Sequence, residues 1–137
     1  MKHTFVVEGD PVGKGRPRFT RQGRAYTPAK TKEYEKRVKD AYIESGGPDF
    51  GEQALILRVN AIMQMPKSWS NKKRKAMTGT PCLKRLDCDN VLKSIQDSLR
   101  EVAYQDDSYI YDCGCIKTWG EIGSAVVVLM TPEGLQE

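Results

Sequence analysis

The chain has 137 residues, of which 39% are hydrophobic and 29% are charged, and its net charge is +4. This composition excludes a disordered tail, and no apolar run approaches the roughly 20 residues that a membrane-spanning helix needs. The length predicts one domain over residues 1–137. Because residues 1–7 do not resemble a secretory signal, we expect a cytoplasmic protein with no membrane partner.

The first third of the chain predicts a strand, an extended segment and a helix. An alternating, β-prone pattern over residues 4–7 predicts a strand that ends in a turn at residues 9–11. Residues 13–28 are rich in Gly, Arg and Pro, which indicates an extended basic loop or hairpin. Apolar residues at helical spacing then predict a helix from Thr31, which would accept the first amide hydrogen bonds, to Ser45.

The middle of the chain predicts a strand and two helices. Residues 54–65 carry apolar residues on both alternating faces, which predicts a strand covered on both sides. Ser70 is the expected cap of a short, basic helix that ends at Met77. An apolar stripe then predicts a longer helix over residues 87–103. The residues of this stripe are Leu92, Ile95, Leu99 and Val102.

The end of the chain predicts two strands, over residues 109–119 and 125–130. They are separated by Gly120 and Gly123, which indicates an antiparallel pair. The full order of elements predicts a single α+β domain in which helices pack on a mixed β-sheet.

The charges are unevenly distributed along the chain. Residues 14–37 carry nine Lys or Arg and two Glu, and residues 66–86 carry seven Lys or Arg and no acid. Residues 87–112 carry seven acids and two bases. Two basic segments around an acidic cluster suit a polyanion that is held while cations act on it, although solvated helix faces would give the same runs.

The acidic cluster contains residues at helical spacing. Asp89, Lys93 and Asp97 are four residues apart and share one helix face, and a helix–strand connection can fold residues 106–107 back beside the helix start. Mg²⁺ is usually held by one or two carboxylates together with substrate phosphate oxygens, and two such ions can activate a water for phosphodiester cleavage. The spacing therefore predicts a magnesium site, with Lys93 placed either to neutralise charge in the transition state or to orient the water.

Each acidic residue also has a structural interpretation. Asp87 is a natural helix N-cap, and the helix dipole favours Asp89 in the first turn. Asp97 could pair with Lys93 or Arg100, and residues 106–107 could be turn residues. Both interpretations remain open at this point.

The cysteines and the histidine suggest no other chemistry. The spacing of the four cysteines does not match the usual zinc-binding patterns, so we expect reduced thiols at Cys82, Cys88, Cys113 and Cys115. The sole histidine, His3, lies in a predicted strand, which leaves Ser-His-Asp and Cys-His mechanisms with one poor candidate.

Five motifs follow one another between about residue 5 and residue 128. They are Gly9-Asp10-Pro11-Val12-Gly13-Lys14-Gly15-Arg16-Pro17-Arg18, Tyr26-Thr27-Pro28 with residues 31–34, Pro66-Lys67-Ser68-Trp69-Ser70, Asp87-Cys88-Asp89-Asn90-Val91-Leu92-Lys93 with Asp97, and Asp106-Asp107-Ser108-Tyr109-Ile110. In this order they resemble the signature blocks of the RusA-type Holliday-junction resolvases of bacteria and their prophages. Two departures are Leu86, where relatives often carry a basic residue, and Cys88, where an aliphatic residue is common.

The resemblance implies a RusA-like fold and a homodimeric endodeoxyribonuclease that nicks two opposing strands of branched, four-way DNA. It implies Mg²⁺ as the cofactor, with Mn²⁺ as a substitute, held by Asp87, Asp89 and Asp107, and it implies that Lys93 is essential. Asp97, Asp106 and Asn90 would support this site. The expected DNA contacts are Lys14, Arg16 and Arg18 in the first basic segment and Lys72, Lys73 and Arg74 in the second.

Two other functions remain open from the sequence. A DNA-binding module without catalysis would use the aspartates only as caps and ion-pair partners. A metal-dependent phosphohydrolase acting on nucleotides would need a small pocket and would leave the two long basic segments without a use.

Overall fold

The computed structural model describes all residues from 1 to 137. Its main sheet has four strands, β1 (Lys2–Glu8), β4 (Leu55–Gln64), β5 (Ile110–Gly120) and β6 (Ser124–Met130), in the order β1-β6-β4-β5. Strand β4 is parallel to β5 and antiparallel to β6, and β1 is antiparallel to β6. The sheet is therefore mixed, and the predicted α+β class is confirmed.

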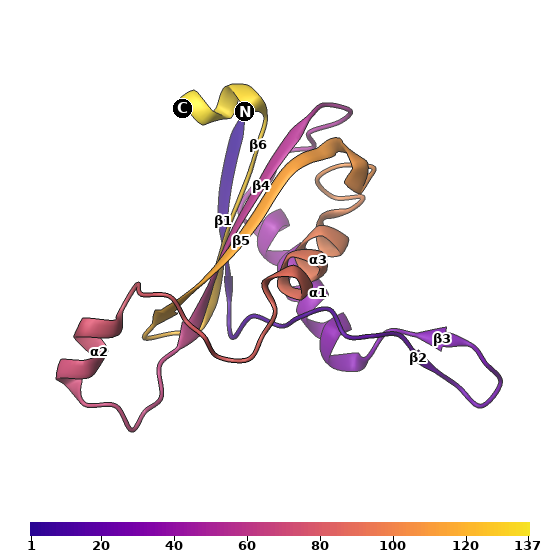
Figure 1. Ribbon diagram of the computed structural model, residues 1–137. Coiled ribbons are helices and arrows are strands. Elements are labelled where there is room, and N and C mark those ends of the chain that lie inside the picture. Colours follow the sequence, from indigo (N-terminus) through magenta and orange to yellow (C-terminus); the bar gives the residue numbers. More distant parts are fainter.

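Helices α1 (Ala29–Glu44) and α3 (Cys88–Leu99) pack on the same face of this sheet (Figure 1). Alternate residues of the strands point toward the two helices, as the period of two requires. On β4 they include Leu57 and Val59, which pack in one core cluster with Tyr34 of α1 and Ile95 of α3. The two helices and the sheet thus share a single hydrophobic core.

The opposite face of the sheet is largely open. Ile56 of β4 is buried, but the next residue on that face, Arg58, is exposed, and so are Val6 of β1 and Ile116 of β5. The prediction that residues 54–65 form a strand covered on both sides was therefore wrong. On that face of β4 only Ile56 is buried and Ile62 is half-buried, so its apolar residues do not reflect a second layer of helices.

The predicted pairing of the last two strands was also wrong. Strands β5 and β6 run in opposite directions, but β4 lies between them and pairs with both. The connection over residues 121–123 crosses the end of β4, where the amide of Met65 donates to the carbonyl of Gly120 (3.0 Å). A short, glycine-containing connection therefore marks a crossover here instead of a tight hairpin.

Two small elements project from this body at opposite ends (Figure 1). One is α2 (Asn71–Met77), and the other is the hairpin of β2 (Arg18–Phe19) and β3 (Ala25–Tyr26). The 3-10 helices η1 (Asp107–Tyr109) and η2 (Pro132–Gln136) precede β5 and follow β6. No helix is both long enough and apolar enough to cross a membrane.

The ends of the helices differ from the predicted ones. The predicted cap Ser70 is confirmed, because its side chain accepts from the amide of Lys73 (3.2 Å). Helix α1 begins two residues before Thr31, after Pro28, and Thr31 accepts from the amide of Gly15 instead of capping the helix (3.1 Å). Helix α3 ends at Leu99 rather than at residue 103, since Glu101 adopts a positive φ of 75° that a helix cannot continue.

The buried face of α3 is also rotated from the predicted stripe. Val91, Ser94 and Ser98 are buried, whereas Leu92 and Val102 are only partly covered. The small serine side chains permit close packing, and the hydroxyl of Ser94 donates to the carbonyl of Val12 (2.9 Å). This contact fixes the N-terminal segment against α3, which is where the candidate site lies.

Candidate active site

The glycine-rich segment after β1 lies across the starts of both α1 and α3. The amide of Lys14 donates to the carbonyl of Asn90 (2.8 Å), and the amide of Gly15 donates to the hydroxyl of Thr31 (3.1 Å). The two contacts, one to each helix, hold residues 13–15 in a fixed place.

This close approach depends on glycine. A Cβ atom added at Gly13 would lie 3.1 Å from the Cβ of Asn90, and one added at Gly15 would lie 2.9 Å from the Oγ1 of Thr31. Because ordinary carbon contacts are longer than this, larger residues would push the segment away from the helices. The two glycines are therefore needed for the geometry of the site.

A groove of about 900 Å³ opens beside this segment. Five basic side chains and one carboxylate line it, and only two of its lining residues are hydrophobic. The basic residues are Lys14, Arg16, Arg18, Lys30 and Arg85, and the carboxylate is Asp87. A positively charged groove with one carboxylate in its lining suits an anionic chain better than a small apolar ligand.

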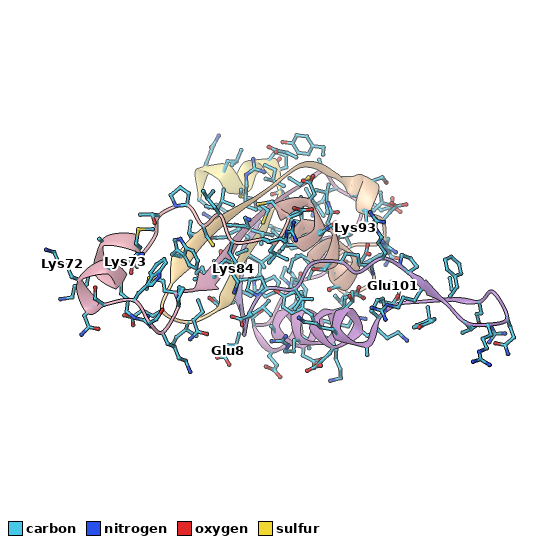
Figure 2. All side chains as sticks on the ribbon, turned by 60° about the horizontal axis from the view of Figure 1, so that its bottom comes forward. Glu8, Lys72, Lys73, Lys84, Lys93 and Glu101 are labelled. Carbon is cyan, nitrogen blue, oxygen red and sulfur yellow. The ribbon has the colours of Figure 1, made fainter.

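The first turn of α3 presents two carboxylates without partners. Asp87 occupies the N-cap position, but its side chain makes no capping hydrogen bond, and neither Asp87 nor Asp89 is part of an ion pair. Lys93, one turn after Asp89, is exposed and also makes no ion pair (Figure 2). The capping interpretation of Asp87 is therefore not supported, and all three side chains are available to a ligand.

The other acidic residues take part in a network of ion pairs. Arg100 contacts the carboxylates of Asp97 (2.8 Å) and Asp107 (2.6 Å), and Asp97 also contacts Lys14 (3.0 Å). Lys14 in turn pairs with Glu35 of α1 (2.5 Å). Of the two partners considered for Asp97, Arg100 is thus the one observed. The network connects the glycine-rich segment, both helices and η1.

The network favours the charged forms of its two cations. Burial lowers the pKa of Lys14, but the carboxylates of Glu35 and Asp97 outweigh this effect and hold the pKa above its usual value. The hydrogen bond to Asp107 is the largest cause that raises the pKa of Arg100. Both cations therefore remain charged at physiological pH and neutralise the acids around them.

Asp106 has a structural role. Its side chain accepts from the amide of Ser108 (2.9 Å) and caps η1. This hydrogen bond lowers the pKa of Asp106, so the carboxylate is ionised at neutral pH. Among the predicted supporting residues, Asp97 therefore joins the ion-pair network, Asp106 caps η1, and Asn90 lines the groove.

The three predicted metal ligands are not assembled into one cluster. No three His, Cys, Asp or Glu side chains lie close enough together to hold a metal ion. Asp87 and Asp89 lie at the start of α3, whereas Asp107 is held by Arg100, which follows the other end of this helix. The fit to Mg²⁺ is nevertheless chemically sound, because two carboxylates with free oxygens match the donors that Mg²⁺ takes from protein before substrate phosphate completes its shell.

The predicted DNA contacts lie in different surroundings. Arg16 and Arg18 are exposed and line the groove, whereas the ammonium of Lys14 is already engaged by Glu35 and Asp97. The second predicted set is on α2, far from α3 in both views (Figures 1 and 2). There Lys72 and Lys73 are exposed, and Arg74 donates to the carbonyl of Pro66 (3.1 Å).

Sequence reasoning missed Lys30 and Arg85 in the groove, and it weighed Arg100 only as a partner of Asp97. Arg85 precedes the aspartate motif by two residues, which was a usable signal once Leu86 was seen to replace a basic residue. The bridge from Arg100 to Asp107 had no comparable signal, because it depends on how residues 99–106 turn.

All four cysteines are free. Burial, together with the neighbouring thiol of Cys88, raises the pKa of Cys115 to about 12, which keeps that thiol protonated and unreactive. The Nε2 atom of His3 and the hydroxyl of Ser45 form a hydrogen bond (2.8 Å). Ser45 follows the C-terminal end of α1, whereas the groove lies at its N-terminal end. Neither Cys115 nor His3 lines the groove.

A basic groove on a mixed-sheet α+β fold, with unpaired carboxylates at the start of α3, fits a protein of the nuclease class. Comparison with protein families gives the same result. A family model described as "Endodeoxyribonuclease RusA" matches residues 8–130. The chain therefore belongs to the RusA family of endodeoxyribonucleases, which the sequence motifs had indicated and which act on Holliday junctions.

The chain is also similar to a protein of Bacillus subtilis (strain 168), "Uncharacterized protein YqaN". The two are 32% identical over 124 residues, which cover 85% of this chain and 87% of the relative. The similarity thus extends over nearly the whole of both proteins.

Proposed function

We propose that this protein resolves four-way DNA junctions by Mg²⁺-dependent, paired nicking as a homodimer, with Mn²⁺ able to replace Mg²⁺. The observation that carries the proposal is the groove itself, whose lining brings five basic side chains together with Asp87 at the start of α3. A DNA strand bound along those cations brings a phosphodiester to the unpaired carboxylates. Such a protein works in the cytoplasm, on the DNA of the nucleoid.

The groove binds DNA through its phosphates. Arg16, Arg18 and Arg85 present charged donors that match phosphate oxygens. Contacts of this kind fix the position of the backbone but carry no base information, so selectivity comes from the shape of the branched DNA.

The carboxylates at the start of α3 supply the ligands for the metal. Asp87 and Asp89 would hold Mg²⁺ together with phosphate oxygens, and Asp107, which Arg100 engages, is the third ligand that the family resemblance implies. When bound, the metal supplies Lewis-acid polarisation of the phosphate and a water of lowered pKa. Lys93, unpaired and one turn from Asp89, neutralises charge that builds on the phosphate.

The homodimer follows from the reaction. One site cuts one strand, whereas resolution of a four-way junction requires two cuts related by a two-fold axis. Two copies also double the basic surface offered to the branched duplex. A mass measurement in solution, with and without junction DNA, tests this part of the proposal.

The proposal is tested with a synthetic four-way junction on a denaturing gel. The wild-type protein should nick two opposing strands with Mg²⁺, should be inactive in EDTA, and should leave linear duplex of the same sequence largely intact. Asp89→Asn should abolish nicking, because it removes a proposed metal ligand. Junction binding should survive, because this carboxylate has no partner in the protein whose loss would disturb the fold. Normal cutting by this variant would refute the site assignment.

One observation favours a second candidate, a DNA-binding protein without catalysis. The side chains form no three-carboxylate group, and Asp97, Asp106 and Asp107 all have structural partners. This candidate predicts salt-sensitive junction binding and no nicking with Mg²⁺ or Mn²⁺. The same gel separates the two functions.

A further inference from the structure

The segment over residues 66–85, here called the basic arm, carries positive charge that the groove does not use, apart from Arg85. It contains seven Lys or Arg and no acid. Four of the seven follow one another in α2, and none of the seven forms an ion pair. This charge has no counterpart within the protein.

The position of the arm is fixed by the edge of the sheet. The amide of Gly79 donates to the carbonyl of Trp119 (2.9 Å), and the amide of Trp119 donates to the carbonyl of Thr80 (3.0 Å). The amide of Cys82 donates to the carbonyl of Lys117 (3.0 Å). These bonds add residues 79–82 to the outer edge of β5, so α2 is held at a defined place.

Aromatic packing fixes the base of α2. The ring of Trp69 meets that of Trp119 edge-on, with centroids 5.0 Å apart, and the ammonium of Lys73 lies 4.2 Å from the centroid of Trp69. Arg74 binds the carbonyl of Pro66. The inner side of α2 is therefore tied to the protein by Lys73 and Arg74.

The outer side of α2 has no structural role. The helix buries no residue, and Lys72 and Lys75, three residues apart and thus on neighbouring positions, are exposed. Like charges at this spacing destabilise a helix, and seven residues are too few for a helix that is stable alone. The contacts that anchor α2 therefore hold Lys72 and Lys75 side by side on the surface, although the two charges repel each other.

We propose that Lys72 and Lys75 on α2 bind the phosphates of a duplex arm of the DNA substrate, on the side of the active site opposite the β2–β3 hairpin. The inference rests on the proposed function. The arm and the hairpin project at opposite ends of the molecule with α3 between them (Figure 1). In Figure 2, Lys84 lies between Lys72 of α2 and Lys93 of α3. Each subunit then holds the substrate on both sides of the scissile phosphate.

The test compares Lys72→Gln/Lys75→Gln with the matched control Lys36→Gln/Lys39→Gln. The control removes the same charge at the same spacing from α1. Binding to a four-way junction is measured in EDTA over a range of salt, so that cutting does not interfere. The α2 variant should bind several-fold more weakly, and the slope of log affinity against log salt should be shallower by about 2, because each phosphate contact contributes roughly 0.9. The control should match wild type.

The location is tested by shortening the junction arms in two-fold related pairs. When the pair of arms that reaches α2 is shortened, wild type also loses its phosphate contacts with Lys72 and Lys75. The difference in affinity between wild type and the α2 variant should then disappear. A wild-type affinity and salt slope for the variant would overturn the inference, and so would a defect that is independent of arm length. Lys72→Arg/Lys75→Arg should restore binding, which separates loss of charge from loss of folding.

The failure of this inference can be told apart from the failure of the proposed function. Nicking by the wild-type protein with Mg²⁺ on the same junction tests that function. If wild type nicks and the α2 variant binds normally, only the inference fails. If wild type binds without nicking and the variant binds weakly, only the catalytic proposal fails.

Discussion

At the residue scale, the site is governed by which charges already have partners. Asp87, Asp89 and Lys93 have none, whereas Arg100 holds both Asp97 and Asp107. The guanidinium of Arg100 lies between these two carboxylates and offsets their mutual repulsion, as a bound metal ion would. The unpaired and the paired acids thus have different roles.

Arg100→Gln should free the carboxylate of Asp107. Arg100 is about half exposed, so we expect the loss of its ion pairs to change the free energy of unfolding by less than about 1 kcal/mol. The Mg²⁺ concentration for half-maximal nicking should fall several-fold, because the metal no longer competes with a guanidinium. A Mg²⁺ titration of nicking and direct Mn²⁺ binding by electron paramagnetic resonance check this result. Arg58→Gln, which breaks the similarly exposed pair with Asp112, should leave both measurements unchanged.

Tyr34→Phe should stabilise the protein or leave its stability unchanged. The hydroxyl of Tyr34 is buried and has no hydrogen-bond partner, and an unsatisfied buried group costs about 1–3 kcal/mol. The matched variant Tyr104→Phe should instead destabilise by about 1 kcal/mol, because that hydroxyl donates to the carbonyl of Gln96 (2.7 Å). Urea unfolding of both variants measures the difference, and equal losses would contradict the assignment of Tyr34.

At the scale of elements, the glycine-rich segment after β1 determines how the groove is built. It lies against the starts of α1 and α3 and is held by hydrogen bonds from Lys14 and Gly15. The basic side chains on one wall of the groove therefore depend on how closely this segment approaches the helices.

Gly15→Ala should disturb the groove more than the fold. The added Cβ meets Thr31 and Pro28, so the segment must move, at a cost of about 1–3 kcal/mol. We expect weaker junction binding in a protein that still unfolds cooperatively. The control is Gly114→Ala on the open face of the sheet, where the nearest atom would lie at an ordinary 3.8 Å. If both variants bound the junction equally well, the proposed dependence on close approach would be wrong.

Local patterns in the sequence predicted the elements but not how they combine. Three confirmed predictions each depend only on residues that are close in the sequence. They are the period of two in β4, the cap of α2 by Ser70, and the turn that carries Asp87 and Asp89. The insertion of β4 between β5 and β6, and the bridge from Arg100 to Asp107, depend on contacts between distant segments. Such contacts follow from the packing of the whole chain, which a local pattern does not record.

At the scale of the whole molecule, one core supports a central site and two basic projections. The core lies between the sheet and the pair α1 and α3, and the projections contribute nothing to it. Stability and DNA binding are therefore separable properties of this fold, with stability resting on the buried side chains of the core.

Global stability should fall steeply above pH 10. Burial raises the pKa of Tyr34 and Tyr42 to about 12, and burial also raises the pKa of Tyr104. Between pH 10 and 12 the unfolded chain releases these protons while the folded protein keeps them, so the free energy of unfolding decreases as pH rises. The decrease is about 1.4 kcal/mol per pH unit for Tyr34 alone. Urea unfolding of Tyr34→Phe over this range should show a shallower fall, whereas Tyr111→Phe, at an exposed ring, should follow wild type.

The central claim is that the basic groove binds DNA and that the unpaired aspartates beside it perform the cleavage. It is tested most directly by single-turnover nicking of a four-way junction at saturating protein, measured together with the dissociation constant. We predict that Asp89→Asn loses cleavage and keeps its affinity, and that Arg16→Gln/Arg18→Gln loses affinity but cleaves at a rate near that of wild type once the junction is saturated. The claim would be contradicted if the aspartate variant cleaved at the wild-type rate, or if the arginine variant bound as tightly as wild type.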